Sequence, residues 1–324
     1  MSQPHETSRY GEPGTAMCAS AHRPGREVGQ HVTMAWRTPR DDDGLRIHFW
    51  GVRGSIAVSG SNYTEFGGHT PCVEVRLGDR LFIIDAGTGI TSLGAALGEN
   101  APPVIDILLS HLHLDHVTGL PFCKPALKTD RLVRTYCGNL GGENAKAALD
   151  RLFSPPLFPV RLDHLPARFE HVGFRAGETL RFEDGIAVET LPLKHPDGAT
   201  GFRFHHGGRS LCYISDIEHC EIQWPPRDLA EFVRGSDLVI FDGMFTETEY
   251  PCCRGWGHST WQKGVELCRA AQVGSLAIFH LSPYHDDETL RCMEAELQAA
   301  MPNAFIARQG QEVVLESLAE VVTA

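Results

Sequence analysis

The chain has 324 residues, 42% of them hydrophobic, so it can bury a substantial core as one large domain or as two ordinary ones. Asp and Glu number 41 against 29 Lys and Arg, and the resulting formal net charge of -12 argues against a surface that grips long nucleic acids. No run has the length of a transmembrane helix and the N-terminus lacks an apolar signal region, so neither membrane insertion nor secretion is indicated.

The first part of the chain differs in composition from the rest. Residues 1–44 are polar, rich in Gly, Pro, Arg and Asp, and have no hydrophobic period, which predicts a flexible tail before a domain over residues 45–324. Translation from Met34, which would leave residues 1–33 out of the native protein, stays open. The 10 cysteines show neither a disulfide framework nor a Cys-x-x-Cys zinc site, which favours reduced thiols and a cytoplasmic location.

The next segment reads mainly as strands. Residues 46–51 form the first, and residues 72–77 and 80–85 form a hairpin whose turn is Gly78-Asp79, a strong two-residue turn signal. Residues 90–97 have helical spacing and stop at Gly98. Residues 104–110 have the length and β-branched content of a buried strand.

Residues 120–183 are irregular, because short apolar pieces alternate with Pro-rich stretches and only a helix over 143–152 stands out. We interpret this segment as a rim or lid over a site, since it shows no core pattern of its own. Further strands are predicted at 186–193, 201–205, 210–215, 238–241, 276–279 and 312–315, with helices at 260–271 and 288–300.

Directly after the strand 104–110 comes a dense set of potential metal ligands, His111-Leu112-His113-Leu114-Asp115-His116. Alternate side chains of an extended segment point the same way, so His111, His113 and Asp115 are expected to converge while His116 points elsewhere. Two imidazoles can hold one metal, and Asp115 with His116 can begin a second. The alternative, a solvated His-rich loop, is disfavoured by this ligand density.

Three later residues stand where other apolar strands stop. His195 follows Leu191-Pro192-Leu193-Lys194, Asp216 follows Cys212-Tyr213-Ile214-Ser215, and His280 follows Ala277-Ile278-Phe279. Each alone reads as a capping or solvated residue. Their repeated placement after strands is what a site at the edge of a sheet requires.

Segment 111–116 resembles the signature of the metallo-β-lactamase superfamily, and His195, Asp216 and His280 follow in the order that this family uses. The resemblance covers residues 45–315 and implies an α/β fold, the αββα sandwich, with two mixed β-sheets packed face to face and helices outside. It implies two divalent metal ions, zinc in the first place and manganese or iron as alternatives. The implied ligands are His111, His113 and His195 on one metal, Asp115, His116 and His280 on the other, and Asp216 as a bridge.

The same resemblance implies the chemistry. A hydroxide shared by the two metals would be the nucleophile, with Asp115 among the catalytic residues. Asp85 matches the family's first motif and is expected to orient a ligand histidine from behind, with capping of the next helix as the alternative. Gly257-His258-Ser259-Thr260 resembles the ribonuclease Z branch, which implies that His258 donates a proton to the leaving oxygen or stabilises the charge of the transition state. The alternative is that His258 is only a neighbour of a helix N-cap.

Two early loops carry the implied substrate-binding residues. Phe49-Trp50-Gly51-Val52-Arg53-Gly54-Ser55 and the later Gly-Gly-x-Thr resemble bacterial metal-dependent hydrolases related to cyclic-nucleotide phosphodiesterases. This resemblance implies contacts from Arg53, Ser55, His69 and Thr70, although that family has Asn at position 69. Arg53 either meets a phosphate or is a surface arginine.

Together these features predict a metal-dependent hydrolase, in the first place a phosphodiesterase for a small cyclic nucleotide or a similar diester. A ribonuclease Z-like RNA endonuclease and a phosphonate-pathway cyclic phosphodiesterase are the alternatives, and a di-iron redox or sensor protein is the alternative of another class. The chain lacks a long basic insertion to hold transfer RNA, and di-iron members commonly carry an acidic residue where His113 stands. The expected partner is therefore a small phosphodiester, with nucleic acid less favoured, no membrane, and a homodimer left open.

Overall fold

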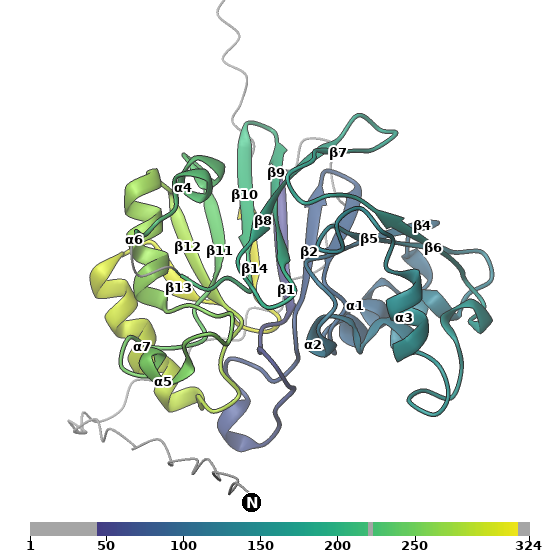
Figure 1. Ribbon diagram of the computed structural model, residues 1–324, viewed down its shortest axis with the longest axis horizontal. Coiled ribbons are helices and arrows are strands. Elements are labelled where there is room, and N and C mark those ends of the chain that lie inside the picture. Colours follow the sequence, from purple (N-terminus) through teal and green to yellow (C-terminus); the bar gives the residue numbers. More distant parts are fainter. Residues whose placement is uncertain (1–43, 220–222, 317–324) are drawn as a thin grey trace, which may run out of the picture. The chain divides into compact units, whose positions relative to one another are not determined.

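The computed structural model describes residues 44–219 and 223–316, which form two seven-stranded β-sheets (Figure 1). The predicted tail over 1–44 lies, apart from residue 44, outside the described residues. In spatial order the first sheet contains β14 (Glu312–Leu315), β1 (Leu45–Gly51), β2 (Cys72–Leu77), β3 (Arg80–Ile84), β4 (Val104–Leu109), β5 (Leu132–Cys137) and β6 (Arg168–Gly173). The second contains β13 (Ala304–Ile306), β12 (Ser275–Phe279), β11 (Leu238–Asp242), β10 (Arg209–Ile214), β9 (Ala199–His206), β8 (Ala187–Leu193) and β7 (Leu180–Arg181).

The two sheets pack face to face because their strands place apolar side chains on the faces that meet, as β1 shows. In β1 the side chains of Leu45, Ile47 and Phe49 are buried and those between them are half-buried, the period of two that a strand requires. The Phe49 ring lies 6.0 Å from that of Phe279 on β12, and the Phe82 ring of β3 lies 5.8 Å from that of Phe204 on β9. These contacts place the main hydrophobic core between the sheets.

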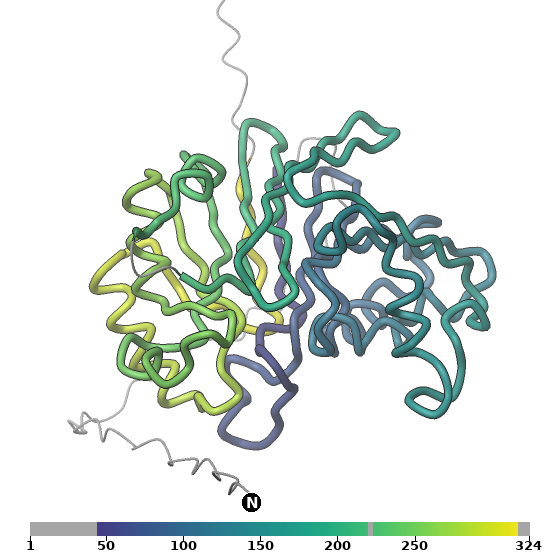
Figure 2. The backbone as a smooth tube through the Cα atoms, viewed as in Figure 1, coloured from purple at the N-terminus to yellow at the C-terminus, as the bar shows by residue number. Residues whose placement is uncertain are grey.

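Helices cover the outer faces of both sheets (Figures 1 and 2). The first sheet is accompanied by α1 (Ile90–Leu97), α2 (Leu114–Val117) and α3 (Lys146–Leu152), and a second apolar cluster lies beneath them. The second sheet is accompanied by α4 (Arg227–Val233), α5 (Tyr250–Cys253), α6 (Trp261–Ala271) and α7 (Asp287–Ala300). The predicted αββα sandwich is therefore confirmed.

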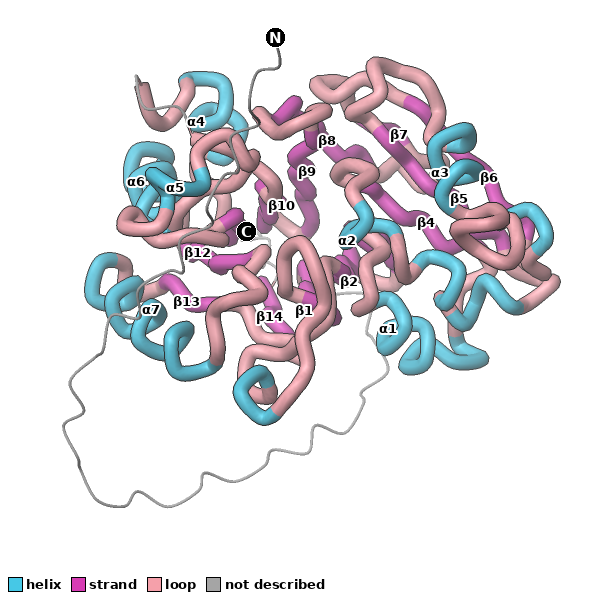
Figure 3. The backbone as a smooth tube through the Cα atoms, turned by 60° about the horizontal axis from the view of Figure 1, so that its bottom comes forward, coloured by secondary structure: helices cyan, strands magenta, loops and turns pink. Residues whose placement is uncertain are grey.

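The direction of the strands decides where their loops lie. Strands β3 to β6 run parallel to one another, as do β10 to β13, whereas the remaining neighbours are antiparallel. Parallel strands end at the same edge of a sheet, so the segments that follow β3 and β4, and those that follow β10 and β12, gather in two groups. Figure 3 looks onto the edge at which loops and the short α2 come together.

The sequence patterns missed several elements, among them the strands β5, β6 and β7 in the segment 120–183. Strands β5 and β6 lie in this segment and extend the first sheet, so the interpretation of all of 120–183 as a rim or lid was wrong for these residues. Strand β6 is the edge of the sheet and its residues are exposed or half-buried, which left no apolar alternation to recognise. Within 44–219 and 223–316 no helix has both the length and the apolar character needed to cross a membrane.

Candidate metal centre

Strand ends from both sheets bring the seven predicted metal ligands into one cluster. His111 follows β4, His195 follows β8, Asp216 follows β10 and His280 follows β12, while α2 carries two more. Their ligand atoms form three overlapping groups within 4.8 Å: His111 with His113 and His195; His111 with His116 and Asp216; and Asp115 with His116 and His280. These groups correspond to the two predicted metal positions and the predicted bridge between them.

The backbone is strained where several of these residues leave their strands. Asp85, Asp216 and His280 have φ angles of 62°, 63° and 56°, in the left-handed region that non-glycine residues seldom adopt. Such a conformation costs on the order of 1–3 kcal/mol per residue and persists only where the surroundings impose it, typically at functional sites. The positive φ angle changes the direction of the chain at the end of each strand, where these side chains lie at or behind the cluster.

One predicted detail of segment 111–116 was wrong. His113 is extended, but α2 begins at Leu114, so the alternation of an extended chain stops there. Asp115 consequently lies beside His116, with Oδ2 3.3 Å from Nε2, and the His116 ring centroid lies 4.2 Å from that of His111. His116 thus points into the cluster, and Asp115 belongs to the second group rather than to the first.

Asp216 occupies the middle of the cluster and is only 1% exposed. Its Oδ1 lies 3.3 Å from His280 Nε2 and 3.7 Å from His195 Nε2, and its Oδ2 lies 3.3 Å from His116 Nε2. Burial alone would raise the pKa of this carboxyl, but His280, His116 and His111 outweigh burial and hold the pKa well below its usual range. Asp216 is therefore a carboxylate between the two groups: Oδ1 faces His195 of one group and His280 of the other, and Oδ2 faces His116.

The distances between facing ring nitrogens in the cluster are those expected for two ligands of one metal ion. His116 donates through Nδ1 to Asp85 and His195 donates through Nδ1 to the Gly257 carbonyl, so each presents Nε2 to the cluster. His116 Nε2 then faces His280 Nε2 at 3.3 Å, and His195 Nε2 faces His113 Nδ1 at 3.0 Å. Two nitrogens on one tetrahedral zinc are about 3.3 Å apart, which is close to both distances.

Further electrostatic features support cation binding at this place. The buried Nε2 of His111 has no hydrogen-bond partner within the described residues. Burial lowers the pKa of His116, yet the carboxylates of Asp216, Asp115 and Asp85 outweigh burial and raise it well above the usual value. For His280 the same opposition, with Asp216 the strongest raising influence, gives a pKa of about 9. The cluster thus attracts positive charge, whether carried by protons or by metal ions.

Asp85 lies behind the cluster, in the predicted orienting position. It is fully buried, and its carboxylate accepts hydrogen bonds from His116 Nδ1 at 2.8 Å, from the Ser110 amide and hydroxyl at 2.8 and 2.9 Å, and from the Tyr213 hydroxyl at 2.8 Å. The helix-capping alternative was wrong, because the N-cap of α1 is Gly89. No sequence pattern pointed to Tyr213, which reaches Asp85 from the opposite sheet.

His258 stands beside the cluster in the loop before α6. Its ring centroid lies 4.8 Å from that of His280 and 5.2 Å from that of His195. Its Nδ1 donates to Asp242 Oδ2 at 2.9 Å, whereas the N-cap of α6 is Thr260. Sequence reasoning missed Asp242, although it ends β11 just as other site residues follow their strands.

The four predicted substrate-binding residues differ in their surroundings. The interpretation of Arg53 as a phosphate contact or a surface residue was wrong, because its side chain is fully buried and donates to main-chain carbonyls. Thr70 is 2% exposed, and its hydroxyl accepts from the Thr88 amide, so it stabilises a loop. Ser55 is exposed and its amide donates to Asp115 Oδ2 at 2.7 Å. His69 is half-buried, with Nδ1 3.0 Å from the Thr88 hydroxyl.

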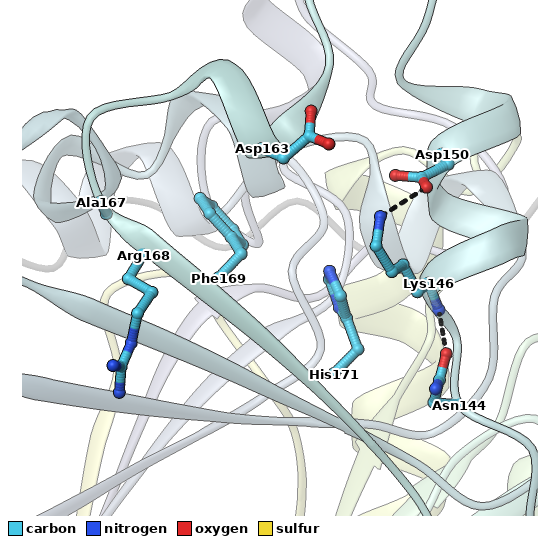
Figure 4. A pocket seen from close by; sticks show the side chains of 8 residues that line it. All are labelled: Asn144, Lys146, Asp150, Asp163, Ala167, Arg168, Phe169 and His171. Atoms are coloured by element: carbon cyan, nitrogen blue, oxygen red, sulfur yellow. Dashed lines mark hydrogen bonds and ion pairs between the residues drawn. The ribbon is translucent and has the colours of Figure 1, made fainter.

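A separate surface pocket lies away from these residues (Figure 4). It is formed by α3, residue 163 and the start of β6, and none of the candidate metal ligands lines it. Lys146, at its wall, is paired with Asp150 at 2.7 Å. The pocket therefore offers a mutually neutralised polar surface rather than a second group of converging ligands.

Comparisons with known proteins agree with this arrangement. The model of the β-lactamase superfamily domain matches residues 80–281. Ribonuclease Z of Bradyrhizobium diazoefficiens is 25% identical over 322 residues, which cover 83% of this chain and 99% of that protein. The metallo-β-lactamase fold protein YhfI of Bacillus subtilis has a TM-score of 0.63 at 17% identity, covering 84% of this chain and 99% of that one.

A diphosphatase from the PhnP family has a TM-score of 0.61 at 19% identity, covering 84% of this chain and 98% of that one. The two structural likenesses show the fold, and the matched family model spans β3 to the end of β12 together with all the candidate metal ligands. The chain therefore belongs to the metallo-β-lactamase superfamily.

Proposed function

We propose that this protein is a metal-dependent phosphodiesterase that hydrolyses a small cyclic nucleotide or a similar diester. The observation that carries the proposal is the Asp242–His258 pair beside the ligand cluster, with a Nδ1–Oδ2 distance of 2.9 Å. When the P–O bond of a phosphodiester breaks, the leaving oxygen carries negative charge and gains a proton, so a proton-bearing side chain beside the metal ligands suits this reaction. The pair supplies a proton-bearing group at this place, next to the residues that would hold the metals.

The proposed ligand set is His111, His113 and His195 for one cation, Asp115, His116 and His280 for the other, and Asp216 between them. Bound divalent cations supply Lewis-acid stabilisation of charge on the phosphoryl group and activate water. Imidazole and carboxylate ligands suit zinc, with manganese or iron as alternatives.

His258 has the role of general acid in this proposal. Asp242 is fully buried and fixes the tautomer by accepting from Nδ1, so Nε2 is the ring nitrogen that holds the proton for the leaving oxygen. Asp242 also stabilises the imidazolium before the proton leaves. The exposed hydroxyl of Ser55 and the half-buried ring of His69 are the proposed substrate contacts, because the Ser55 amide is bonded to Asp115 at the edge of the cluster.

The test is the variant His258→Ala with zinc-reconstituted protein and bis(p-nitrophenyl) phosphate as substrate. We expect turnover to fall about 10²- to 10⁴-fold, as is usual for loss of a general acid. The zinc content should stay that of the wild type. The control is His205→Ala, a half-exposed histidine on β9 paired with Glu189, which should change neither quantity. A lowered zinc content in His258→Ala would instead make His258 a ligand, since it also lies in a group with His195 and Asp216.

The substrate class needs a second measurement. A ribonuclease Z-like RNA endonuclease is the second candidate, because the similarity to ribonuclease Z extends over 99% of that protein. Zinc-reconstituted protein should be assayed with cyclic nucleotides, a cyclic ribose phosphodiester, a 3′-extended transfer RNA precursor, a lactam and a thioester. Preferential cleavage of the transfer RNA precursor would replace our first choice with the second. Preference for the cyclic ribose phosphodiester would favour the phosphonate-pathway alternative.

The redox alternative makes a different prediction about the metal. A di-iron protein would retain iron on purification and would show reversible absorption changes on reduction, whereas the hydrolase should work with redox-inactive zinc. Activity with zinc alone would therefore exclude the redox role as the main one. The cytoplasmic location and a homodimer stay predictions, which fractionation and light scattering would check.

A further inference from the structure

The segment Val52–Ser55, directly after β1, is paired with the residue that follows His280. The Leu281 amide donates to the Val52 carbonyl at 2.8 Å, and the Gly54 amide donates to the Leu281 carbonyl at 2.9 Å. Gly54 lies so close to the His280 ring that an added Cβ would be 2.3 Å from Nδ1. The absence of a side chain at position 54 therefore makes the space that the His280 ring occupies.

The same segment also holds a second candidate ligand. The Ser55 amide donates to Asp115 Oδ2 at 2.7 Å, and this is the carboxylate oxygen that lies 3.2 Å from His280 Nε2. Two of the three residues of the Asp115–His116–His280 group are thus fixed by neighbouring residues of one segment. The other group is fixed differently, because His195 is bonded to Gly257 and His111 to Ser110.

Arg53 ties this segment to the loop behind His280. Its Nη1 donates to the carbonyls of Ser282 and His285 at 2.9 and 2.6 Å, and its Nε donates to the Gly67 carbonyl at 2.8 Å. Burial lowers the pKa of Arg53, with Asp287 the strongest opposing influence, and Nη2 is buried with no hydrogen-bond partner within the described residues. Burying an incompletely paired guanidinium lowers the stability of the fold, so we expect Arg53 to have a specific role.

We propose that Val52–Ser55 and the Arg53 side chain form a clamp that sets the occupancy of one metal position only, the one made by Asp115, His116 and His280. Arg53 is a positioning residue in this clamp, since its side chain contacts neither Asp115 nor His280 and acts through the carbonyls of residues 282 and 285. This inference rests on the two-metal site of the proposed function. It goes further because it assigns the metal affinity of one position to residues that do not affect the affinity of the other.

The test is Arg53→Lys, measured in metal-free protein titrated with Zn²⁺ or Co²⁺. Lysine keeps the charge but is a point donor and cannot reproduce the guanidinium's fork of hydrogen bonds. We expect affinity at one position to fall about 10- to 100-fold, as is typical when a partner behind a ligand is lost, while the other position keeps its affinity. Dialysed protein should then hold nearly one metal in place of two, and the Co²⁺ absorption of the second equivalent should weaken.

The matched control is Arg203→Lys. Arg203 also donates to main-chain carbonyls, those of Phe232 and Arg234, but lies on β9 and contacts no candidate ligand. This variant should bind two metals as the wild type does. If Arg53→Lys does not fold, Gly54→Ala replaces it, because the added Cβ displaces the His280 ring while leaving Arg53 in place.

The outcomes separate this inference from the proposed function. Wild-type protein that binds no metal would refute the proposed function itself. Wild-type protein that binds two metals, with folded Arg53→Lys or Gly54→Ala binding both at wild-type affinity, would overturn the clamp alone. Equal weakening of both positions, or failure of both variants to fold, would also overturn it, because the segment would then support the whole fold rather than one position.

Discussion

Replacing Asp85 by Asn should weaken metal binding and destabilise the metal-free protein. Three donors, the hydroxyls of Ser110 and Tyr213 and Nδ1 of His116, share Asp85 Oδ2, while the Ser110 amide uses Oδ1. In Asp85→Asn, the amide oxygen can accept from the three donors that share Oδ2 only if the NH₂ group occupies the position of Oδ1. There it meets the Ser110 N–H, so two donors face each other in a fully buried position.

The expected magnitudes follow from these contacts. A buried donor left without an acceptor costs about 1–3 kcal/mol of the free energy of unfolding. Loss of the charge-assisted bond that orients His116 should lower zinc affinity about 10- to 100-fold, equivalent to about 1.4–2.7 kcal/mol. Tyr213→Phe is the comparison, because it removes one donor and leaves the other three. It should cost about 0.5–1.5 kcal/mol of stability with nearly unchanged zinc affinity.

Thermal unfolding in the presence of a chelator measures the first quantity, and competition with a chromophoric zinc chelator measures the second. Wild-type zinc affinity in Asp85→Asn would refute the orienting role of Asp85. An equal loss of affinity in Tyr213→Phe would show that packing between the sheets, rather than the carboxylate, controls His116.

Two further outcomes are expected. Asp242→Asn should lower turnover of bis(p-nitrophenyl) phosphate about tenfold or more without loss of zinc, because His258 loses the partner that fixes its tautomer; unchanged turnover would leave Asp242 without a role in the reaction. Zinc affinity should rise by roughly tenfold per pH unit for each proton displaced, between pH 7 and 9. The sign follows from His280, whose raised pKa of about 9 keeps a proton on the metal-free site that zinc must displace. Protonated His280 also stabilises the folded metal-free protein, fully so below pH 6.5, the ordinary pKa of histidine. This stabilisation is lost as the pH rises through 9, so the free energy of unfolding of metal-free protein should fall between pH 6.5 and 9. Calorimetry at several pH values would test this.

The sequence by itself predicted most of the strands and the histidines and aspartates that follow them, because a period of two marks a half-buried strand and a polar residue directly after it marks a sheet edge. The sandwich fold and the ligand set were what the resemblance of segment 111–116 to a known family implied. His195, Asp216 and His280 are each placed by such a pattern, and the structure brings them together with segment 111–116. Strand β6 escaped recognition because an edge strand with exposed and half-buried residues carries little of this signal, whereas β5 is an interior strand that was overlooked in an irregular, Pro-rich segment.

Only the tertiary structure decided which residues lie behind the candidate ligands and which of the predicted substrate-binding residues are buried. Tyr213 and Asp85 are 128 positions apart, and Arg53 meets His285 across 232 positions, so no local pattern records either contact. Arg53, for which the sequence left a phosphate contact or a surface position open, is buried, because the loop after β12 folds over it and supplies carbonyl oxygens. Likewise His116 entered the cluster because the chain turns into α2 at Leu114, a change of backbone direction that the spacing of the histidines could not reveal. Local periodicity places a residue on an element, whereas its partners depend on how the two sheets pack.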